Sequence, residues 1–277
     1  MDIGITLAKM PTYYDGTAHY LLKADEDFVA LNRFIGRQIS VEFLNQKFCA
    51  GCGQEFAELF RMGFCKNCFF TRPEAGESII RPELSRAHLG EEDRDLAFEK
   101  GYQLQPHIVY LANSGGLKVG VTRGRQQWHR WMDQGASYAL VFAQTENRYQ
   151  AGQIEVALKA FIGDKTPWQR MLKNQVEAID LLAEKERLAA ELDKDLSQWV
   201  SAHKEVNEIH YPVRQYPDKV KSLNLNKSRS ITAKLQGIKG QYWIMEGGNV
   251  LNVRSHTGFR VRLSLPASIA TAKDATD

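Results

Sequence analysis

All four cysteines of this 277-residue chain lie within twenty consecutive positions. They form two Cys-x-x-Cys pairs, Cys49 with Cys52 and Cys65 with Cys68, and twelve residues separate the pairs. Each pair turns tightly enough to bring two sulfur atoms to one metal ion at a distance of about 2.3 Å. The pattern therefore predicts a zinc ribbon or knuckle module over residues 48–72, in which four thiolates hold a structural Zn²⁺ and no ligand position stays open.

Two disulfides or a redox-active Cys-x-x-Cys are the alternatives to zinc. The chain has no apolar stretch of the ~18 residues that a membrane span needs, and its first residues, MDIGITLAKMP, do not resemble a signal peptide. These features predict a cytoplasmic protein without a membrane segment. A reducing cytoplasm disfavours disulfides, so zinc is the preferred interpretation.

The segments around the cysteines indicate an α+β fold. Residues 1–47 form an N-terminal β segment, in which apolar Ile39, Val41 and Phe43 alternate with polar neighbours. Residues 73–106 are polar, rich in acidic side chains and interrupted by prolines, which is typical of a connecting segment. Residues 212–265 form a C-terminal segment of antiparallel strands, and we expect residues 266–277 to be a flexible tail.

Residues 107–174 show a sharper order. HIVYLA and LKVGVT are short β-type runs joined by Asn-Ser-Gly-Gly, which indicates a hairpin. A helical pattern follows near residues 125–134, then a strand at 138–143 and a second helix at 148–162. The predicted order of this central domain is β-β-α-β-α.

A long helix is predicted over residues 175–211, because apolar residues recur there at helical spacing. Two interpretations remain open. The helix packs on the protein's own core, or it pairs with a second copy as a coiled coil and makes the protein a homodimer.

The net charge of +3 conceals an uneven distribution. Ten basic and two acidic residues lie between positions 212 and 262, so this segment carries +8 and the rest of the chain carries −5. Basic residues neutralise phosphates, and interleaved aromatic residues stack on bases, so the segment indicates nucleic-acid binding. A solvated basic face that balances the acidic remainder is the alternative. The candidate nucleic-acid contacts are Arg123, Lys227, Arg229, Lys234 and Lys239.

The central domain resembles the GIY-YIG nuclease domain. Ile108-Val109-Tyr110 stands where the first motif of that family lies, and Lys118-Val119-Gly120 stands where the second lies. Lys118 replaces the second tyrosine, and Asn174 is only a candidate for the asparagine that follows the second helix of the family.

The resemblance implies four catalytic candidates, Tyr110, Lys118, Arg130 and Glu155. Tyr110 would activate water, Arg130 or else Arg123 would bind the phosphate, and Glu155 would hold Mg²⁺ or Mn²⁺. Glu155 is also notable by itself, because it falls at the edge of the apolar stripe of its helix, where a carboxylate needs a partner.

A longer resemblance covers nearly the whole chain. The strings CAGCG, FCKNCF, HIVYLANS, LKVGVTR and GIKGQYWIM are similar to those of a bacterial family of uncharacterised proteins that joins cysteine knuckles to a GIY-YIG-like core. Three functions follow as hypotheses. The chain is a zinc-stabilised nucleic-acid-binding protein with metal-dependent nuclease activity, a binding module of the same fold that does not cleave, or an interaction scaffold that dimerises through its long helix.

Overall fold

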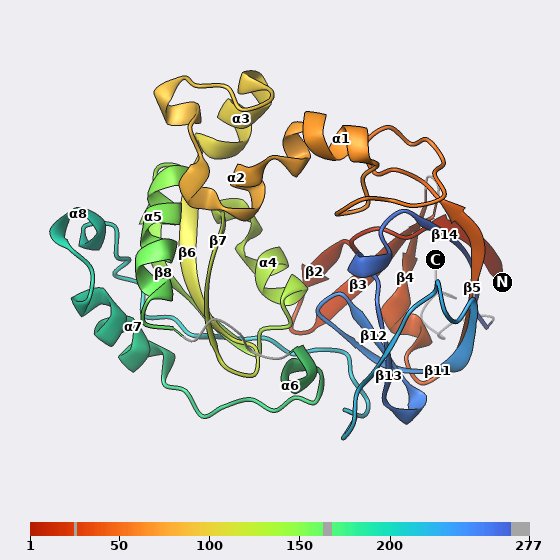
Figure 1. Cartoon of the computed structure of the whole chain (residues 1–277). Helices are drawn as coiled ribbons and strands as arrows, with labels where there is room; N and C mark the ends of the chain where they lie inside the picture. Colours follow the sequence, from red (N-terminus) through yellow and green to blue (C-terminus); the bar gives the residue numbers. More distant parts are fainter. Residues whose placement is uncertain (25–26, 163–167, 267–277) are drawn as a thin grey trace, which may run out of the picture.

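The computed structural model describes residues 1–24, 27–162 and 168–266, and it shows an α+β protein with three β-sheets and short helices (Figure 1). The largest sheet has seven strands in the order β1-β14-β5-β11-β12-β13-β10. Its strands are β1 (Asp2–Thr6), β5 (Gln38–Lys47), β10 (Lys221–Leu223), β11 (Ser230–Lys239), β12 (Tyr242–Met245), β13 (Asn249–Asn252) and β14 (Phe259–Ser264). A three-stranded sheet consists of β2 (Thr12–Tyr14), β3 (Ala18–Ala24) and β4 (Asp27–Ala30).

Strand β5 lies inside the seven-stranded sheet, between β14 and β11, and is antiparallel to both. Ile39, Val41 and Phe43 are buried, as the alternation predicted, whereas Ser40 and Glu42 lie on the more open face. Strands β1 and β5 near the N-terminus and β10–β14 near the C-terminus thus lie in one sheet. The C-terminal strands are not all antiparallel as predicted, because β10 pairs with β13 in parallel.

The central part of the chain carries the third sheet, which has four strands in the order β7-β6-β8-β9. The strands are β6 (His107–Asn113), β7 (Leu117–Arg123), β8 (Tyr138–Thr145) and β9 (Asn207–Glu208), and the helices that follow β7 and β8 are α4 (Gln127–Asp133) and α5 (Arg148–Lys159). The predicted order of two strands, a helix, a strand and a helix is confirmed.

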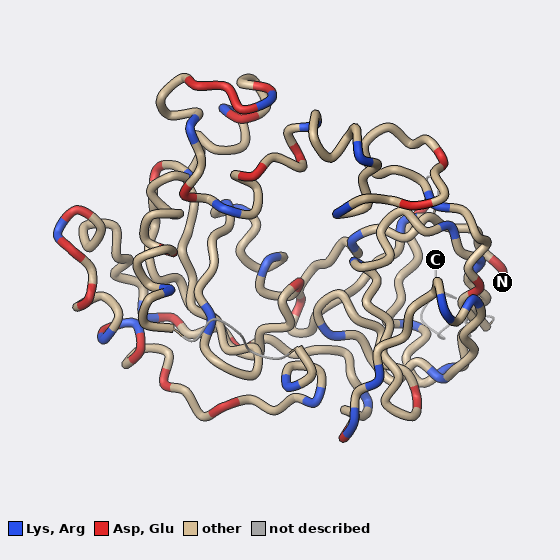
Figure 2. The backbone as a smooth tube through the Cα atoms, viewed as in Figure 1, with Lys and Arg blue, Asp and Glu red and all other residues tan. Residues whose placement is uncertain are grey.

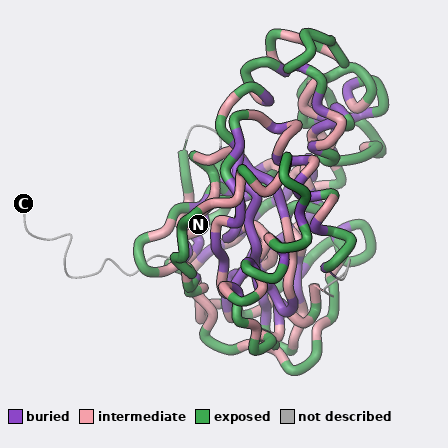
Figure 3. The backbone as a smooth tube through the Cα atoms, turned by 90° about the vertical axis from the view of Figure 1, so that its left-hand side faces the viewer, coloured by how far each residue is buried: buried purple, intermediate pink, exposed green. Residues whose placement is uncertain are grey.

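Strand β6 separates two apolar cores. All seven of its residues are buried. Val109 and Leu111 pack in the core formed with α5, whereas Tyr110 and Ala112 belong to the core shared with α4 and the seven-stranded sheet. Figure 3 shows the buried segments running through the middle of the molecule.

The prediction of one long helix over residues 175–211 is wrong. Two short helices stand there, α7 (Leu181–Ala190) and α8 (Lys194–Ser197), followed by β9. Asp180 accepts hydrogen bonds from the backbone N–H groups of Leu182 and Ala183, and Asp193 accepts one from Leu196, so each aspartate begins a separate helix. The apolar side chains of α7 pack on the protein's own core rather than forming an exposed seam.

The segment between the cysteines and β6 is more ordered than a plain connection. It contains α2 (Glu77–Ile80), α3 (Leu96–Gln103) and the 3₁₀ turns η2 (Pro73–Ala75), η3 (Pro82–Leu84) and η4 (Ala87–Leu89). The remaining helices are α1 (Lys66–Thr71), α6 (Trp168–Leu172), η1 (Leu31–Phe34), η5 (Gly124–Gln126), η6 (Glu246–Gly248) and η7 (Arg254–His256). The tail predicted for residues 266–277 lies outside the described residues from position 267 onward. Within the described ranges, no helix has both the length and the apolar character needed to cross a membrane.

Candidate metal centre and arginine cleft

The four cysteines converge at one point. The sulfur atoms of Cys49, Cys52, Cys65 and Cys68 all lie within 4.8 Å of one another, and none of the four is in a disulfide. A tetrahedral zinc ion with bonds of about 2.3 Å places its sulfur ligands roughly 3.8 Å apart, so this cluster has the right size and ligand chemistry for Zn²⁺. The geometry makes a four-thiolate zinc site plausible.

Backbone N–H groups surround one of these sulfur atoms. The Sγ of Cys49 accepts hydrogen bonds from the N–H groups of Gly51, at 3.3 Å, and Cys65, at 3.1 Å. Burial raises the pKa of the Cys49 thiol, but the N–H donors outweigh burial and bring that pKa down to about 6. A cysteine that ionises readily is suited to metal ligation, because the thiolate is the binding form.

A hairpin of the zinc module, residues 61–64, is packed tightly against the turn that precedes β14. Gly63 has a φ of +82°, and a Cβ there would lie 2.4 Å from the Cγ2 atom of Thr257. The N–H of Phe48 also donates to the carbonyl of Gly258 at 2.7 Å. The module is therefore held against the seven-stranded sheet, next to η7.

A cleft of about 400 Å³ lies where the zinc module and the seven-stranded sheet meet the four-stranded sheet with its helices α4 and α5. We call it the arginine cleft. Five basic side chains line it, from the β1–β2 loop, β7, α4, α5 and η7: Lys9, Arg123, Arg130, Arg148 and Arg254. The only acidic residue in its lining is Asp133, which forms an ion pair with Lys9. Figure 2 shows Lys and Arg in this region both on the side of the four-stranded sheet and on the side of the seven-stranded sheet.

Two of these arginines are held by an aromatic ring. The guanidinium carbons of Arg123 and Arg148 lie 4.8 Å and 5.2 Å from the ring centre of Tyr102. Arg148 is buried and donates to the carbonyls of Ser78 and Ile79 at 3.0 Å and 2.8 Å. Arg123 and Arg254 form no ion pair with a carboxylate among the described residues, so their charge is available to an anion. Arg148 also forms no such ion pair, but Glu155 attracts its charge.

Arg130 links the cleft to two of the other catalytic candidates. It interacts electrostatically with both Tyr110 and Glu155, and its buried Nε atom has no hydrogen-bond partner in the described chain. Burial raises the pKa of Glu155, Lys159 opposes this at 3.4 Å, and nearby Glu83 adds to the rise. The Oε2 atom of Glu155 accepts no hydrogen bond, and the Lys159 ammonium at 3.4 Å is its ion-pair partner.

Tyr110 does not reach the cleft surface. Its side chain is fully buried, its hydroxyl donates to Gln134 Oε1 at 2.7 Å, and burial raises its pKa against the attraction of Arg130. The ring lies over Gly120 on the neighbouring strand, where a Cβ would come within 2.4 Å of the hydroxyl oxygen. Neither Tyr110 nor Glu155 is part of the cleft lining. Lys118 sits opposite Ala112 on β7, and burial lowers its pKa.

The basic candidates of the C-terminal segment do not form one site with the cleft. Lys227, Arg229 and Lys234 are exposed; the first two precede β11 and Lys234 lies on it. Lys239 at the other end of β11 is buried, and its Nζ donates to Ser137 Oγ at 3.1 Å and Asn174 Oδ1 at 2.9 Å. We therefore regard Lys239 as a structural cation. Asn174, the candidate for the family's asparagine, is its partner.

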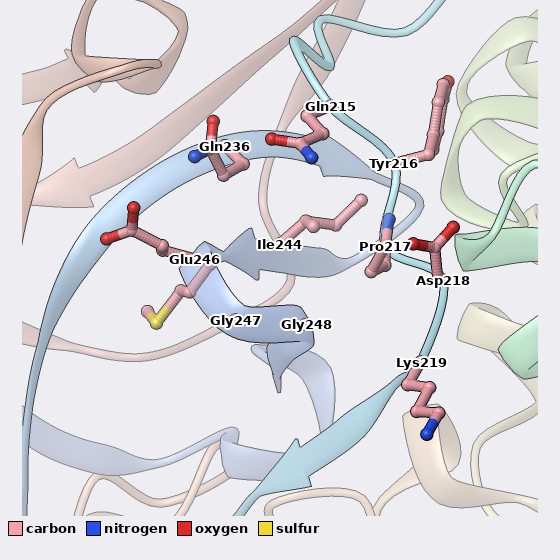
Figure 4. Close-up of a pocket in the computed structure, with 11 residues that line it drawn as sticks. Gln215, Tyr216, Pro217, Asp218, Lys219, Gln236, Ile244, Glu246, Gly247 and Gly248 are labelled. Carbon is pink, nitrogen blue, oxygen red and sulfur yellow. The ribbon is translucent and has the colours of Figure 1, made fainter.

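A second hollow, of about 480 Å³, lies in the C-terminal segment, between residues 215–219 and the β12–η6 turn (Figure 4). Gln215 and Gln236 lie above Ile244 in this view. The charged residues that line this hollow are Asp218, Lys219 and Glu246, and their formal charges sum to −1. The most basic segment of the sequence thus contains a hollow that does not suit a phosphate.

The comparison with known families finds one match. Residues 36–261, more than three quarters of the chain, match the family described as Protein of unknown function (DUF2797). The chain belongs to the DUF2797 family. No curated protein and no solved structure matches it.

The cleft residues Lys9 and Arg148 did not emerge from the sequence, because each is an isolated basic residue. Arg254 was counted in the basic segment 212–262, but its place in a cleft with residues far away in the chain was not predicted. Arg148 does stand one residue after the helix-capping Asn147, but this places it on a helix and does not indicate a cleft.

Proposed function

We propose that this DUF2797 protein binds the phosphodiester backbone of a nucleic acid in the arginine cleft. The observation that carries the proposal is the convergence of five basic side chains, four of them arginines, on one concavity with a single acidic residue. Arginine presents several N–H donors in a planar fork that matches phosphate oxygens, and phosphate neutralisation is the main source of affinity for nucleic acids.

The zinc module supports this function by its position. Its residue Met62 lines the cleft, and Gly63 packs against Thr257, which follows the η7 turn that carries Arg254. Zinc would therefore hold one wall of the cleft in place without taking part in any reaction.

Metal-dependent cleavage of the GIY-YIG type is the second candidate. The β-β-α-β-α order, the electrostatic interaction of Arg130 with Tyr110 and Glu155, and the buried position of the Glu155 carboxylate favour it. Carboxylate oxygens are the ligands that Mg²⁺ and Mn²⁺ prefer, and Glu155 would hold the ion together with water. The buried hydroxyl of Tyr110 favours binding without cleavage, because a water-activating group must reach the substrate.

Fluorescence anisotropy with labelled oligonucleotides tests the binding proposal. We expect salt-dependent binding by the zinc-loaded protein, with affinity reduced about tenfold or more in the double variant Arg123→Gln, Arg254→Gln, and a shallower salt dependence. Arg187→Gln on α7 is the matched control, since this exposed arginine pairs with Glu184 away from the cleft. Lys234→Gln examines the alternative surface on β11.

Unchanged affinity in the cleft variant would refute the proposal, and a loss confined to Lys234→Gln would move the interface to the C-terminal segment. Cleavage is scored in the same samples with Mg²⁺ or Mn²⁺. Products that disappear in both Tyr110→Phe and Glu155→Gln would establish the second candidate, whereas binding without products would exclude it.

A further inference from the structure

The zinc module keeps large aromatic side chains at its surface. Phe60 is 45% exposed and Phe70 is 55% exposed, and together with the half-buried Phe69 they form what we call the phenylalanine cluster. The three ring centres lie 5.1 Å to 5.6 Å from one another. Exposed apolar rings that gather in this way mark a binding surface more often than rings that lie apart.

The backbone that carries the cluster is held next to the cysteine pairs. Phe69 and Phe70 follow Cys68 within α1, a helix whose N-cap is Cys65. Phe60 is fixed from the other side, since its N–H donates to the carbonyl of Phe64 at 2.7 Å. Binding to this surface would therefore cost little conformational entropy.

A cation accompanies the rings. The guanidinium carbon of Arg61 lies 5.5 Å from the ring centre of Phe60 and 5.9 Å from that of Phe69. Arg61 has no carboxylate partner among the described residues. Aromatic faces beside an arginine suit a ligand that has both flat rings and negative charge.

The cluster continues into the arginine cleft. Met62, the residue after Arg61, lines the cleft, and both belong to the hairpin in which Arg61 pairs with Phe64. A chain whose phosphates occupy the cleft would thus reach the hairpin that carries Arg61, beside the rings.

We propose that the phenylalanine cluster stacks the unpaired bases of a single-stranded nucleic acid whose phosphates lie in the arginine cleft. This inference rests on the proposed function and narrows its substrate class. Bases in a duplex are stacked on one another and turned inward, so only an unpaired strand offers its ring faces to such a surface. Stacking depends little on base identity, and the preference would be for strandedness rather than sequence.

A second copy of the chain is the alternative occupant of the cluster. A symmetric contact through these rings would place Arg61 of one copy beside Arg61 of the other, and like charges at an interface are unfavourable. The negative charge of a nucleic acid complements Arg61 instead.

The test compares one labelled single strand with a duplex of the same sequence, using zinc-loaded protein. We expect the double variant Phe60→Ala, Phe70→Ala to lose about tenfold or more in affinity for the single strand and to bind the duplex as wild type does. Phe28→Ala is the matched control, because Phe28 is also 55% exposed but lies on β4. Equal affinity of wild type and the double variant for the single strand would overturn the inference.

Phe70→Trp allows an independent fluorescence measurement in which an aromatic side chain is kept at position 70. We expect the added tryptophan fluorescence to be quenched by the single strand and not by the duplex, and an unchanged signal with a bound single strand would refute stacking. Sedimentation that shows a wild-type dimer separated by Phe60→Ala, Phe70→Ala would assign the cluster to a second copy and overturn the inference. If wild type binds neither oligonucleotide, the proposed function itself fails.

Discussion

Lys239 provides a stability test whose sign and size follow from the structure. Its ammonium is buried between the rings of Tyr211 and Tyr216, with ring centres 4.9 Å and 5.5 Å from Nζ, and its two hydrogen-bond partners are neutral. Burial lowers the pKa of Lys239 from 10.5 to about 8. The unfolded chain keeps the ordinary value, so between these two pH values the unfolded state binds more protons than the folded state.

Stability therefore rises with pH in this window. The difference between 10.5 and about 8, at 1.36 kcal/mol for each pH unit, gives a total gain of about 3 kcal/mol across the window. Between about pH 7.5 and about pH 9.5 the same relation gives about 2 kcal/mol. Burial raises the pKa of Tyr216 to about 12 and that of Tyr211 well above its ordinary value, so neither ring ionises in this range.

Urea unfolding at the two pH values measures the effect. Other groups also titrate, so the quantity of interest is the difference between wild type and Lys239→Met, in which this contribution is absent. Lys234→Met is the matched control, because Lys234 lies on the same strand but is exposed. If wild type and Lys239→Met show the same pH dependence, the ammonium is not desolvated as described and the reasoning is refuted.

Three further predictions concern packing, capping and the metal. Gly120→Ala should lower the free energy of unfolding by about 1–3 kcal/mol, because the new methyl group would collide with the buried Tyr110. Gly101→Ala is the control, since the space around Gly101 is open and this substitution should not be destabilising. Urea unfolding compares the two variants with wild type. Asp180→Ala should cost about 0.5–2 kcal/mol through loss of the N-cap of α7, and an unchanged unfolding midpoint would contradict the capping role. Elemental analysis should find about one zinc ion per chain, and a chelator or Cys65→Ser should lower the melting temperature; a melting temperature insensitive to both would exclude a structural metal.

The sequence predicted local features well where a short pattern has one physical solution. Two Cys-x-x-Cys pairs at this spacing bring their sulfur atoms together, and they do so here. The alternation in β5 predicts a half-buried strand, since a pleated strand buries every second side chain. The short polar turn between β6 and β7 likewise predicts the hairpin that these strands form.

The predictions from sequence failed where tertiary structure determines how a residue is placed. Helical spacing extends across residues 175–211, but it does not show that Asp180 and Asp193 begin separate helices, because a solvated aspartate and a capping aspartate look the same in sequence. Lys234 and Lys239 are both lysines of one basic strand, yet one is exposed and the other buried. The cleft depends on sheet topology, which brings positions 9, 148 and 254 together.

The order of strands in the large sheet also determines when it can be completed during synthesis. Strand β5 ends at residue 47, but both of its neighbours, β11 and β14, come from residues 230–264. While the ribosome makes the intervening residues, β5 has neither hydrogen-bonding partner, whereas β6, β7, β8 and α5 are already complete. The strands β6, β7 and β8 with helix α5 therefore have the opportunity to fold first, and residues 230–264 add the neighbours of β5 afterwards.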